Sequence, residues 1–328
     1  MSMKAVKMLG NEQVSVVDMP DPQADGRQVI VKIMSSALCG SERHAYYGDH
    51  VIPGNAGHEA AGIVHDAGTS EIVSKGDRVA LHASSACGRC RECFEGNWVR
   101  CRNPSQTHRT IGNHSQFVQI RDELCLPLPD DISFDTGALL GDVMGTPYRA
   151  IKRLGVTGFD HVLIMGQGPI GLAATMICKF LNAEVTVADV NEYRLEQSLR
   201  CGADRVLPAT SHELSGLAPD VALDCSGNSD AQTLCLDTVK PGGRVALIGV
   251  SEDGPRINTT RHFVLKELTV IGSWYSTPVD HLELIDLVRR GLSPEAMITH
   301  RFGIDEAPRA FTSFFTGEAA KVMLTPWG

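Results

Sequence analysis

The pattern of hydrophobic and polar positions changes at about residue 155 of the chain. Before this point, short apolar runs separated by Pro, Gly and Asp turns predict strands at residues 4–8, 14–19, 28–34 and 77–81. After it, almost wholly apolar runs predict buried strands at 161–165, 184–189, 205–207, 221–227, 243–250 and 268–273, with helical patterns between several of them. Buried strands that alternate with helices are typical of a doubly wound parallel sheet. We therefore expect an α/β protein whose first domain is β-rich and whose second domain is doubly wound.

The end of the chain differs from both of these regions. Amphipathic patterns predict helices at 280–291 and 305–317, and an apolar run predicts a terminal strand at 321–326. We find no internal repeat and no low-complexity linker in the sequence.

Composition and charge argue against several classes of partner. The 328 residues carry a formal net charge of −9, whereas a nucleic acid or an anionic membrane would favour a basic surface. The N-terminus has no apolar run behind its lysines, unlike a secretory signal. No stretch approaches the ~20 apolar residues of a membrane span. We therefore expect a cytoplasmic protein, in which thiols stay reduced.

Four of the ten cysteines fall in one short segment, with the pattern C-x2-C-x2-C-x7-C formed by Cys87, Cys90, Cys93 and Cys101. Such short spacings let one irregular segment surround a tetrahedral zinc with Zn–S distances near ~2.3 Å. Two disulfides are the alternative, but disulfides are rare in the cytoplasm. We predict a zinc site, and because four thiolates leave no open coordination position, this zinc is expected to be structural.

A glycine turn between the strand at 161–165 and a predicted helix consists of Gly166, Gln167, Gly168, Pro169, Ile170 and Gly171. In this context the pattern G-x-G-x-x-G indicates dinucleotide binding, because glycines permit close approach to a pyrophosphate and the helix N-terminus offers free N–H groups. Asp189 ends the next strand, where a carboxylate accepts hydrogen bonds from ribose hydroxyls and repels a 2′-phosphate, so NAD is favoured over NADP. Arg194 is a candidate for stacking on adenine, and a solvated helix surface is the equal alternative.

A second group of candidate ligands lies among polar turns of the first domain and consists of Cys39, His44, His58 and Glu59. Cysteine and histidine from separate loops can form a catalytic zinc site with three protein ligands and an exchangeable water. Each residue alone is more typical of ordinary packing. Their occurrence together with a four-cysteine segment and a dinucleotide turn favours an active site.

These motifs occur in the order found in medium-chain, zinc-dependent alcohol dehydrogenases, and the chain resembles this family over nearly its whole length. The stretches CGSE, GHE and GQGPIG look most like the polyol and threonine dehydrogenase branch. The resemblance implies a GroES-like catalytic domain at 1–144 with a structural zinc lobe at 87–101, an NAD-binding Rossmann domain at 145–277, and a return segment at 278–328 that completes the catalytic domain. It also implies a homo-oligomer, either dimer or tetramer.

The resemblance further implies which residues bind the catalytic zinc. Cys39 and His58 match two ligands of the family, and the third ligand position falls on Asp142. Polyol dehydrogenases usually have glutamate at this position, so Asp142 is a departure, and Glu59 is the other candidate as an intermittent ligand or a neighbouring carboxylate. Glu42 replaces the family's usual aspartate and is expected to orient His58.

The resemblance also implies the chemistry. Zinc lowers the pKa of the substrate hydroxyl, hydride passes to NAD, and the proton leaves through Ser41 and His44, for which a turn serine and a surface histidine are the alternative roles. The expected substrate is a small molecule, a secondary alcohol of a polyol, sugar or related hydroxy compound. An amino-alcohol dehydrogenase of the threonine or aminocyclitol type is the alternative enzyme, and a non-catalytic NAD-binding protein is the alternative outside enzymes.

Overall fold

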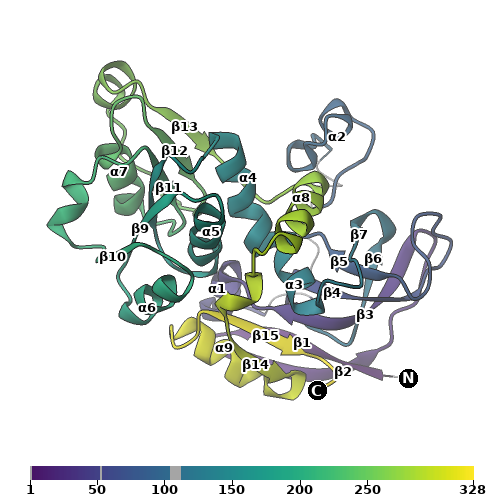
Figure 1. Cartoon of the computed structure of the whole chain (residues 1–328). Coiled ribbons are helices and arrows are strands. Elements are labelled where there is room, and N and C mark those ends of the chain that lie inside the picture. The colour runs from purple at the N-terminus through teal and green to yellow at the C-terminus, as the bar shows by residue number, and fades with distance from the viewer. Residues whose placement is uncertain (1, 52–53, 104–111) are drawn as a thin grey trace. The chain divides into compact units, whose positions relative to one another are not determined.

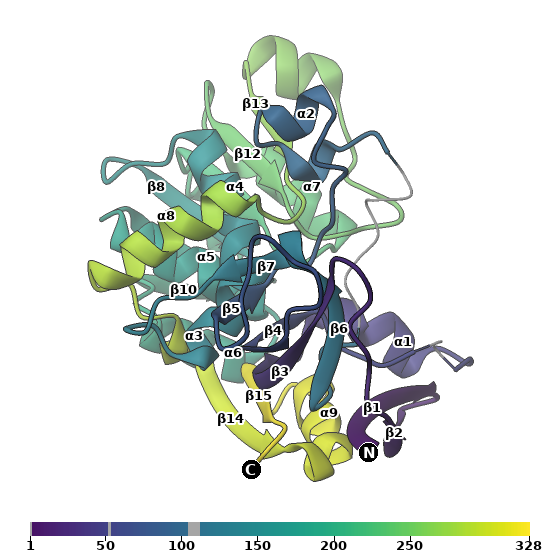
Figure 2. The same ribbon diagram turned by 90° about the vertical axis from the view of Figure 1, so that its right-hand side faces the viewer.

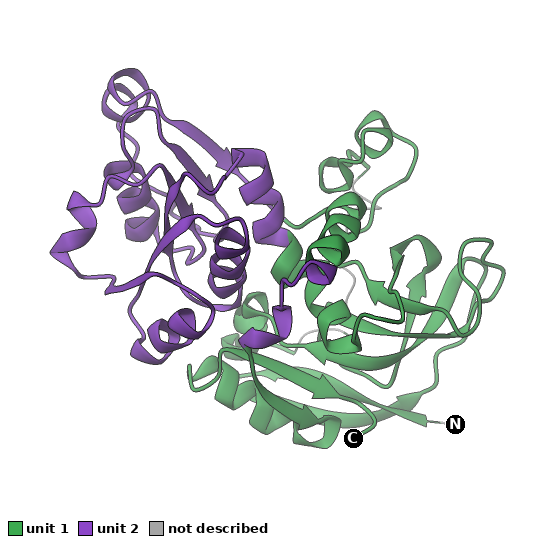
Figure 3. Ribbon diagram, viewed as in Figure 1, with its two compact units in different colours: residues 1–145, 275–287, 298–328 green, residues 146–274, 288–297 purple. Residues whose placement is uncertain are grey.

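The computed structural model describes residues 2–51, 54–103 and 112–328. The chain divides into two compact units (Figure 3). The first unit comprises residues 1–145, 275–287 and 298–328, and the second comprises residues 146–274 and 288–297. Residues 288–297, which fall within the expected return segment, thus belong to the second unit.

The second unit contains a six-stranded sheet, coloured from teal to green in Figure 1. Its strands are all parallel and lie in the order β10-β9-β8-β11-β12-β13. They are β8 (His161–Met165), β9 (Glu184–Asp189), β10 (Arg205–Pro208), β11 (Val221–Asp224), β12 (Arg244–Leu247) and β13 (Thr269–Gly272). Numbered along the chain, this order is the 3-2-1-4-5-6 arrangement of the Rossmann fold. The six predicted strands and the doubly wound fold are confirmed.

Helix α4 (Gly145–Leu154) precedes the first of these strands, and helices α5 (Pro169–Phe180), α6 (Glu192–Arg200) and α7 (Ser229–Thr238) connect later ones. Two of these helices begin at asparagine N-caps. The Asn191 side chain accepts a hydrogen bond from the Arg194 amide at the start of α6, and the Asn228 side chain accepts hydrogen bonds from the Asp230 and Ala231 amides at the start of α7. The strand β11 is buried along its whole length, as expected for a strand with both faces covered.

The first unit is β-rich. The hairpin of β1 and β2 accompanies a sheet in the order β14-β15-β3-β4-β5-β7, with β6 paired to β3 (Figure 2). Its strands are β1 (Ser2–Gly10), β2 (Gln13–Pro20), β3 (Gln28–Ala37), β4 (Glu59–Asp66), β5 (Arg78–Leu81), β6 (Phe117–Arg121), β7 (Cys125–Pro127), β14 (Ile298–Gly303) and β15 (Lys321–Thr325). The strands predicted in the first domain and at the end of the chain are confirmed, whereas β4, β6, β7 and β14 were not predicted.

The remaining helices are mostly short. The α-helices are α1 (Arg43–Tyr47), α2 (Arg91–Phe94), α3 (Phe134–Leu139), α8 (Pro278–Arg289) and α9 (Ala307–Phe315), and π-helices span Leu140–Met144 and Thr260–Leu265. Single 3-10 turns lie at Gly40–Glu42, Trp98–Arg100, Asp122–Leu124, His212–Gly216, Pro294–Met297 and Ile304–Glu306. The two helices predicted near the end of the chain correspond to α8 and α9. Among the residues described, no helix combines the length and the apolarity that crossing a membrane requires.

The end of the chain completes the sheet of the first unit. β15 pairs with β14 on one side and with β3 on the other, and the Leu38 amide donates to the Val322 carbonyl at 3.0 Å. The helix α9 lies beside β2 (Figure 2). It contributes the fully buried Phe311 to an apolar cluster that also contains Tyr46 and Phe315. Residues from the two ends of the sequence therefore share one core.

Replacing Phe311 by alanine should lower the free energy of unfolding of the first unit by about 3–5 kcal/mol, because the lost ring leaves a cavity. Urea denaturation followed by the fluorescence of Trp98 and Trp327, both in this unit, measures the change. Phe159→Ala is the control, because this side chain is fully exposed. Equal effects of the two substitutions would show that Phe311 does not belong to the core.

Candidate functional site

The four predicted cysteines of the lobe come together in the structure. The sulfur of Cys90 lies 3.4 Å from that of Cys93 and 3.9 Å from that of Cys101, and the Cys87 and Cys93 sulfurs are 3.9 Å apart. All ten cysteines of the chain are free thiols. Four sulfurs around a zinc at ~2.3 Å would lie about 3.8 Å from one another. The donor set therefore fits a tetrahedral zinc and contains no disulfide.

Backbone N–H groups supply electrostatic support for thiolates in this lobe. Hydrogen bonds from the Cys93 backbone and thiol lower the pKa of Cys90 to about 6, and a bond from the Arg89 backbone lowers the pKa of Cys87. Burial raises the pKa of Cys93 to about 12. Zinc binds the deprotonated thiolate, so loading the lobe would release protons.

A second cluster unites Cys39, His58, Glu59 and Asp142, whose candidate ligand atoms all lie within 4.8 Å of one another. Cys39 follows the end of β3, and His58 precedes the first residue of β4, so neighbouring strands bring both side chains to one edge of the sheet. His58 Nε2 is 3.0 Å from Asp142 Oδ2, and Cys39 Sγ is 3.8 Å from the same oxygen. All four side chains are buried.

The backbone around Asp142 shows how a short carboxylate reaches this cluster. Asp142 lies in the π-helix Leu140–Met144, whose wider turn is common at functional sites. At the preceding residue, Gly141, an added Cβ would lie only 2.7 Å from the carbonyl oxygen of Leu81. The absence of a side chain at position 141 thus permits close approach of this helix to β5, which places Asp142 beside His58.

Glu59 has a partner that the sequence reasoning missed. Lys321 is completely buried at the start of β15 and donates from Nζ to Glu59 Oε2 at 2.8 Å and to the Leu38 carbonyl at 2.7 Å. The sequence feature that could have indicated this partner is a lysine at the first position of an otherwise apolar strand. Among the described residues, Glu59 Oε1 has no hydrogen-bond partner. An unsatisfied carboxylate oxygen beside a thiol, an imidazole and a second carboxylate fits a cation-binding site.

The pKa directions in this cluster reflect burial and mutual repulsion. Burial raises the pKa of Glu59 to about 7 with help from Asp142, although Lys321 and His58 act in the opposite direction. Burial also raises the pKa of Cys39. For His58, burial disfavours the charged ring, but Cys39 and Asp142 together raise its pKa well above the usual value. A divalent cation among these groups would offset the repulsion between thiolate and carboxylates.

Both predicted relay residues are exposed, and one of them contacts this cluster. The Ser41 hydroxyl donates to Cys39 Sγ at 3.4 Å. His44 lies in α1 and is exposed. In the described part of the chain, no hydrogen bond joins Ser41 to His44.

Glu42 contacts the backbone on both sides of the cluster. Its Oε2 accepts from the Cys39 amide and its Oε1 from the Gly57 amide, each at 3.0 Å, and His114 is a further partner, whereas no hydrogen bond joins the described side chains of Glu42 and His58. Burial disfavours the charged carboxylate, but His114, His58 and the Cys39 amide outweigh it and lower its pKa to about 2. His114 is a second residue that the sequence reasoning missed.

The glycine turn in the second unit leaves space beside its backbone. Gly166 has a positive φ of 87°, and a Cβ at Gly171 would lie 1.9 Å from the Gly166 carbonyl oxygen. A Cβ at Gly168 would meet no atom within 4 Å. Pro169, which has no N–H, and Ile170 open α5, so the first N–H groups of the helix, those of Ile170 and Gly171, lie next to this space. The turn fits the close approach of a pyrophosphate.

Asp189 and Arg194 lie near this turn. Asp189 Oδ2 accepts from the Gln167 amide at 2.5 Å, and Oδ1 accepts from the Asn191 amide at 2.8 Å. Each carboxylate oxygen can accept a further bond. Arg194 is half-buried on α6, and its backbone amide donates to the Asn191 cap.

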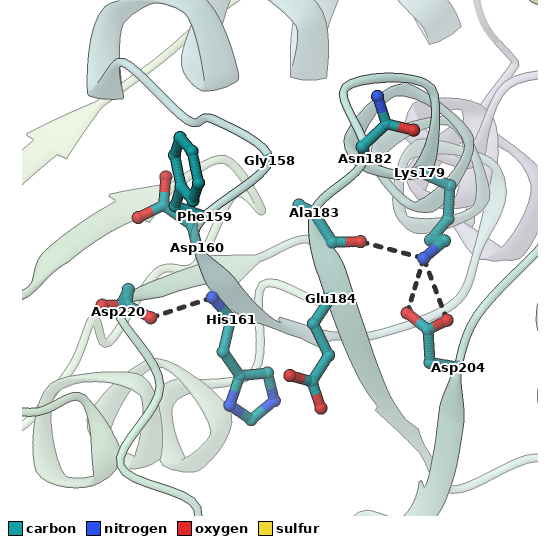
Figure 4. A pocket seen from close by; sticks show the side chains of 10 residues that line it. All are labelled: Gly158, Phe159, Asp160, His161, Lys179, Asn182, Ala183, Glu184, Asp204 and Asp220. Atoms are coloured by element: carbon teal, nitrogen blue, oxygen red, sulfur yellow. Dashed lines mark hydrogen bonds and ion pairs between the residues drawn. The ribbon is translucent and has the colours of Figure 1, made fainter.

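A pocket of about 420 Å³ lies at the opposite edge of the same sheet (Figure 4). Its residues lie at or before the amino ends of β8, β9, β10 and β11, and Lys179 comes from the last turn of α5. Its aspartates are already bonded: Asp204 pairs with Lys179, Asp160 with Arg244, and Asp220 with Lys240 and the His161 amide. Ligands of doubly wound sheets bind outside the carboxyl ends of the strands, so this pocket is not the dinucleotide site.

Comparisons with known proteins agree with this geometry. An alcohol dehydrogenase GroES-like domain matches residues 25–130, and a zinc-binding dehydrogenase domain matches residues 169–290. The L-threonine 3-dehydrogenases of Shewanella putrefaciens and Shewanella baltica are 31% and 32% identical over 349 residues, which covers 98% of this chain and 99% of each relative.

Solved structures show the same fold. The alcohol dehydrogenase TADH from Thermus sp. ATN1 has a TM-score of 0.91 at 25% identity, covering 98% of this chain and 99% of that one. The acetophenone reductase of Geotrichum candidum in complex with NAD has a TM-score of 0.86 at 25% identity, covering 99% and 98%.

The chain therefore belongs to the medium-chain, zinc-dependent dehydrogenase family. It is an oxidoreductase that acts on CH–OH groups, and its cofactors are zinc and a nicotinamide dinucleotide. The GroES-like and Rossmann folds expected from the resemblance are confirmed.

Two glycines of the turn should separate dinucleotide binding from folding. Gly168→Ala should leave thermal unfolding unchanged but raise the Kd for the dinucleotide about tenfold or more, or ~1.4 kcal/mol, because its methyl group occupies the open space. Gly171→Ala should instead destabilise the second unit, because its Cβ collides with the Gly166 carbonyl. Calorimetry measures both the thermal unfolding and the Kd for the dinucleotide. Unchanged dinucleotide affinity in Gly168→Ala would show that no pyrophosphate approaches there.

Proposed function

We propose that the protein oxidises a secondary alcohol of a polyol, sugar or related hydroxy compound with NAD, at a zinc held by Cys39, His58 and Asp142. The observation that supports this most strongly is the convergence of these three side chains and Glu59 within 4.8 Å in a buried site. We assign a second, structural zinc to the lobe of Cys87, Cys90, Cys93 and Cys101.

Asp142 is favoured over Glu59 as the third ligand. Its Oδ2 lies 3.0 Å from His58 Nε2, whereas one oxygen of Glu59 is bonded to Lys321. The ion pair with Lys321 holds Glu59 beside the site and partly neutralises it. Glu59 would then serve as a neighbouring carboxylate with an unpartnered oxygen, available as an intermittent ligand.

The residues of the chain have distinct roles in this reaction. Zinc would supply Lewis-acid polarisation of the alcohol oxygen, and the nicotinamide would accept the hydride. Cys39, His58 and Asp142 orient the reacting centre and exclude bulk water from one side of it. Ser41 takes the proton of the alcohol and passes it towards His44 and solvent, a role supported by its contact with Cys39 Sγ and its exposure.

NAD is proposed over NADP because of Asp189. This carboxylate ends β9 and is held in place by two backbone amides, so it remains a fixed anion near the turn. Such an anion would repel a 2′-phosphate and accept bonds from ribose hydroxyls. Arg194 follows on α6 and is assigned to the adenine.

An amino-alcohol substrate of the threonine type is the second candidate. The similarity to the L-threonine 3-dehydrogenases, which are 31–32% identical to this chain over almost its whole length, favours this candidate. Threonine carries its hydroxyl on a secondary carbon, so the same ligand set could serve both substrate classes.

We also propose a homo-oligomer in a reducing, cytoplasmic compartment. The ten free cysteines support the proposal of a reducing compartment, because thiols stay reduced there. Val264 and Leu265, 68% and 72% exposed, support an apolar contact between copies of the chain.

Purified protein should reduce NAD with one class in a panel of polyols, sugar acids and hydroxy amino acids, and should contain two zinc ions per chain. Asp142→Ala should retain the lobe zinc and the NAD affinity but lose the second zinc and turnover together. Asp49→Ala is the control, since its carboxylate is exposed in the same unit. Full zinc content with near-normal turnover in Asp142→Ala would remove Asp142 from the site, and activity with L-threonine alone would select the second candidate.

Asp189→Ser should raise the KM for NAD and narrow the preference over NADP, because both the ribose acceptor and the repelling charge are lost. The measurement is kcat/KM with each cofactor. Equal wild-type values for the two cofactors would refute the role of Asp189.

A further inference from the structure

A single buried carboxylate links the two loops that carry Cys39 and His58. Glu42 Oε2 accepts the amide of Cys39 itself, and Oε1 accepts the amide of Gly57, the residue before His58. Both bonds are 3.0 Å long, and Glu42 is only 7% exposed. The two oxygens of this side chain therefore set the spacing between the two ligand-bearing segments.

His114 holds the other side of this carboxylate. Its Nε2 lies 3.3 Å from Glu42 Oε1 and 3.4 Å from Oε2, so the ring is shared between the two oxygens. Because an ionised carboxylate only accepts hydrogen bonds, Nε2 must carry the proton. The other ring nitrogen, Nδ1, lies 3.0 Å from Ser36 Oγ at the end of β3. His114 is completely buried.

The His114 ring packs closely against neighbouring groups. It meets Phe311 edge to face with centroids 5.8 Å apart. A Cβ on Gly57 would lie 2.6 Å from the His114 ring, so this glycine, with a φ of 94°, is required for the contact. The His114 amide also donates to the Ala56 carbonyl at 2.9 Å. The histidine is thus fixed against the loop that leads to His58.

We infer that Glu42 and His114 form a positioning pair that holds Cys39 and His58 at the spacing needed for the catalytic zinc. This inference rests on the proposed function. Neither residue touches the reacting atoms: Glu42 acts through the amides of Cys39 and Gly57, and His114 acts through Glu42. Outer partners that orient metal ligands commonly contribute 10–100-fold to metal affinity or activity.

Two substitutions at position 114 separate this role from simple packing. A glutamine amide nitrogen can replace histidine Nε2, so His114→Gln keeps a donor to Glu42 but loses the partner of Ser36. An asparagine amide can replace only Nδ1, so His114→Asn keeps Ser36 and loses Glu42. Glu42→Gln is nearly isosteric but turns an N–H group towards one of the two backbone amides.

The zinc affinity of each variant is measured by competition with a chelator, with the lobe zinc as internal reference. Glu42→Gln and His114→Asn should lower the zinc affinity of the site of Cys39, His58 and Asp142 by about 10–100-fold and alter the visible spectrum of this site when cobalt replaces zinc. His114→Gln should remain closer to wild type in both. The double variant Glu42→Gln/His114→Asn should lose little more zinc affinity than the single variant that binds zinc less tightly, because the two residues act as one unit.

His281→Asn is the matched control, because His281 is also a completely buried histidine of the first unit and binds the Pro127 carbonyl. It should lower stability without changing zinc affinity or the cobalt spectrum. The inference is overturned if Glu42→Gln and His114→Asn keep wild-type zinc affinity and spectrum, whatever their stability. A wild-type protein that holds only the lobe zinc would instead refute the proposed function.

Discussion

The first unit buries four ionisable side chains within 4.8 Å of one another, and the surrounding structure is arranged to make this possible. Removing charged groups from water is costly unless they are paired or bind a cation. Lys321, on the last strand of the chain, forms an ion pair with Glu59, and His114 contacts Glu42, which accepts the Cys39 amide. The remaining thiol, imidazole and carboxylate of Cys39, His58 and Asp142 form a buried donor set that fits a divalent cation.

Close approach between backbones is the second requirement, and glycines meet it in both units. Gly141 lets the helix that carries Asp142 approach the carbonyl of Leu81, and Gly57 makes room for the ring of His114. In the second unit, Gly171 lies against Gly166, so that α5 begins directly beside the turn. In each case a Cβ would collide with a neighbouring backbone oxygen or ring, so the close contact requires glycine.

The two candidate zinc sites differ in the way the chain builds them. The lobe cysteines lie within fifteen residues of sequence, so one local segment brings all four sulfurs together. The cluster of Cys39, His58 and Asp142 depends on the pairing of β3 with β4 and on the π-helix after α3. A local site tolerates change elsewhere in the fold, whereas the second cluster is sensitive to any shift of these elements.

The sequence by itself determined the features that depend on local patterns. Apolar runs identified all six Rossmann strands, glycine spacing identified the turn before α5, and cysteine spacing identified the lobe. It missed β4, β6, β7 and β14, whose short or mixed patterns become strands only through their neighbours in the sheet. Only the tertiary structure decided that Lys321 meets Glu59 and that His114 meets Glu42. These partners are 262 and 72 residues apart in the sequence, and a local pattern can mark a lysine as unusual without indicating which distant side chain it meets.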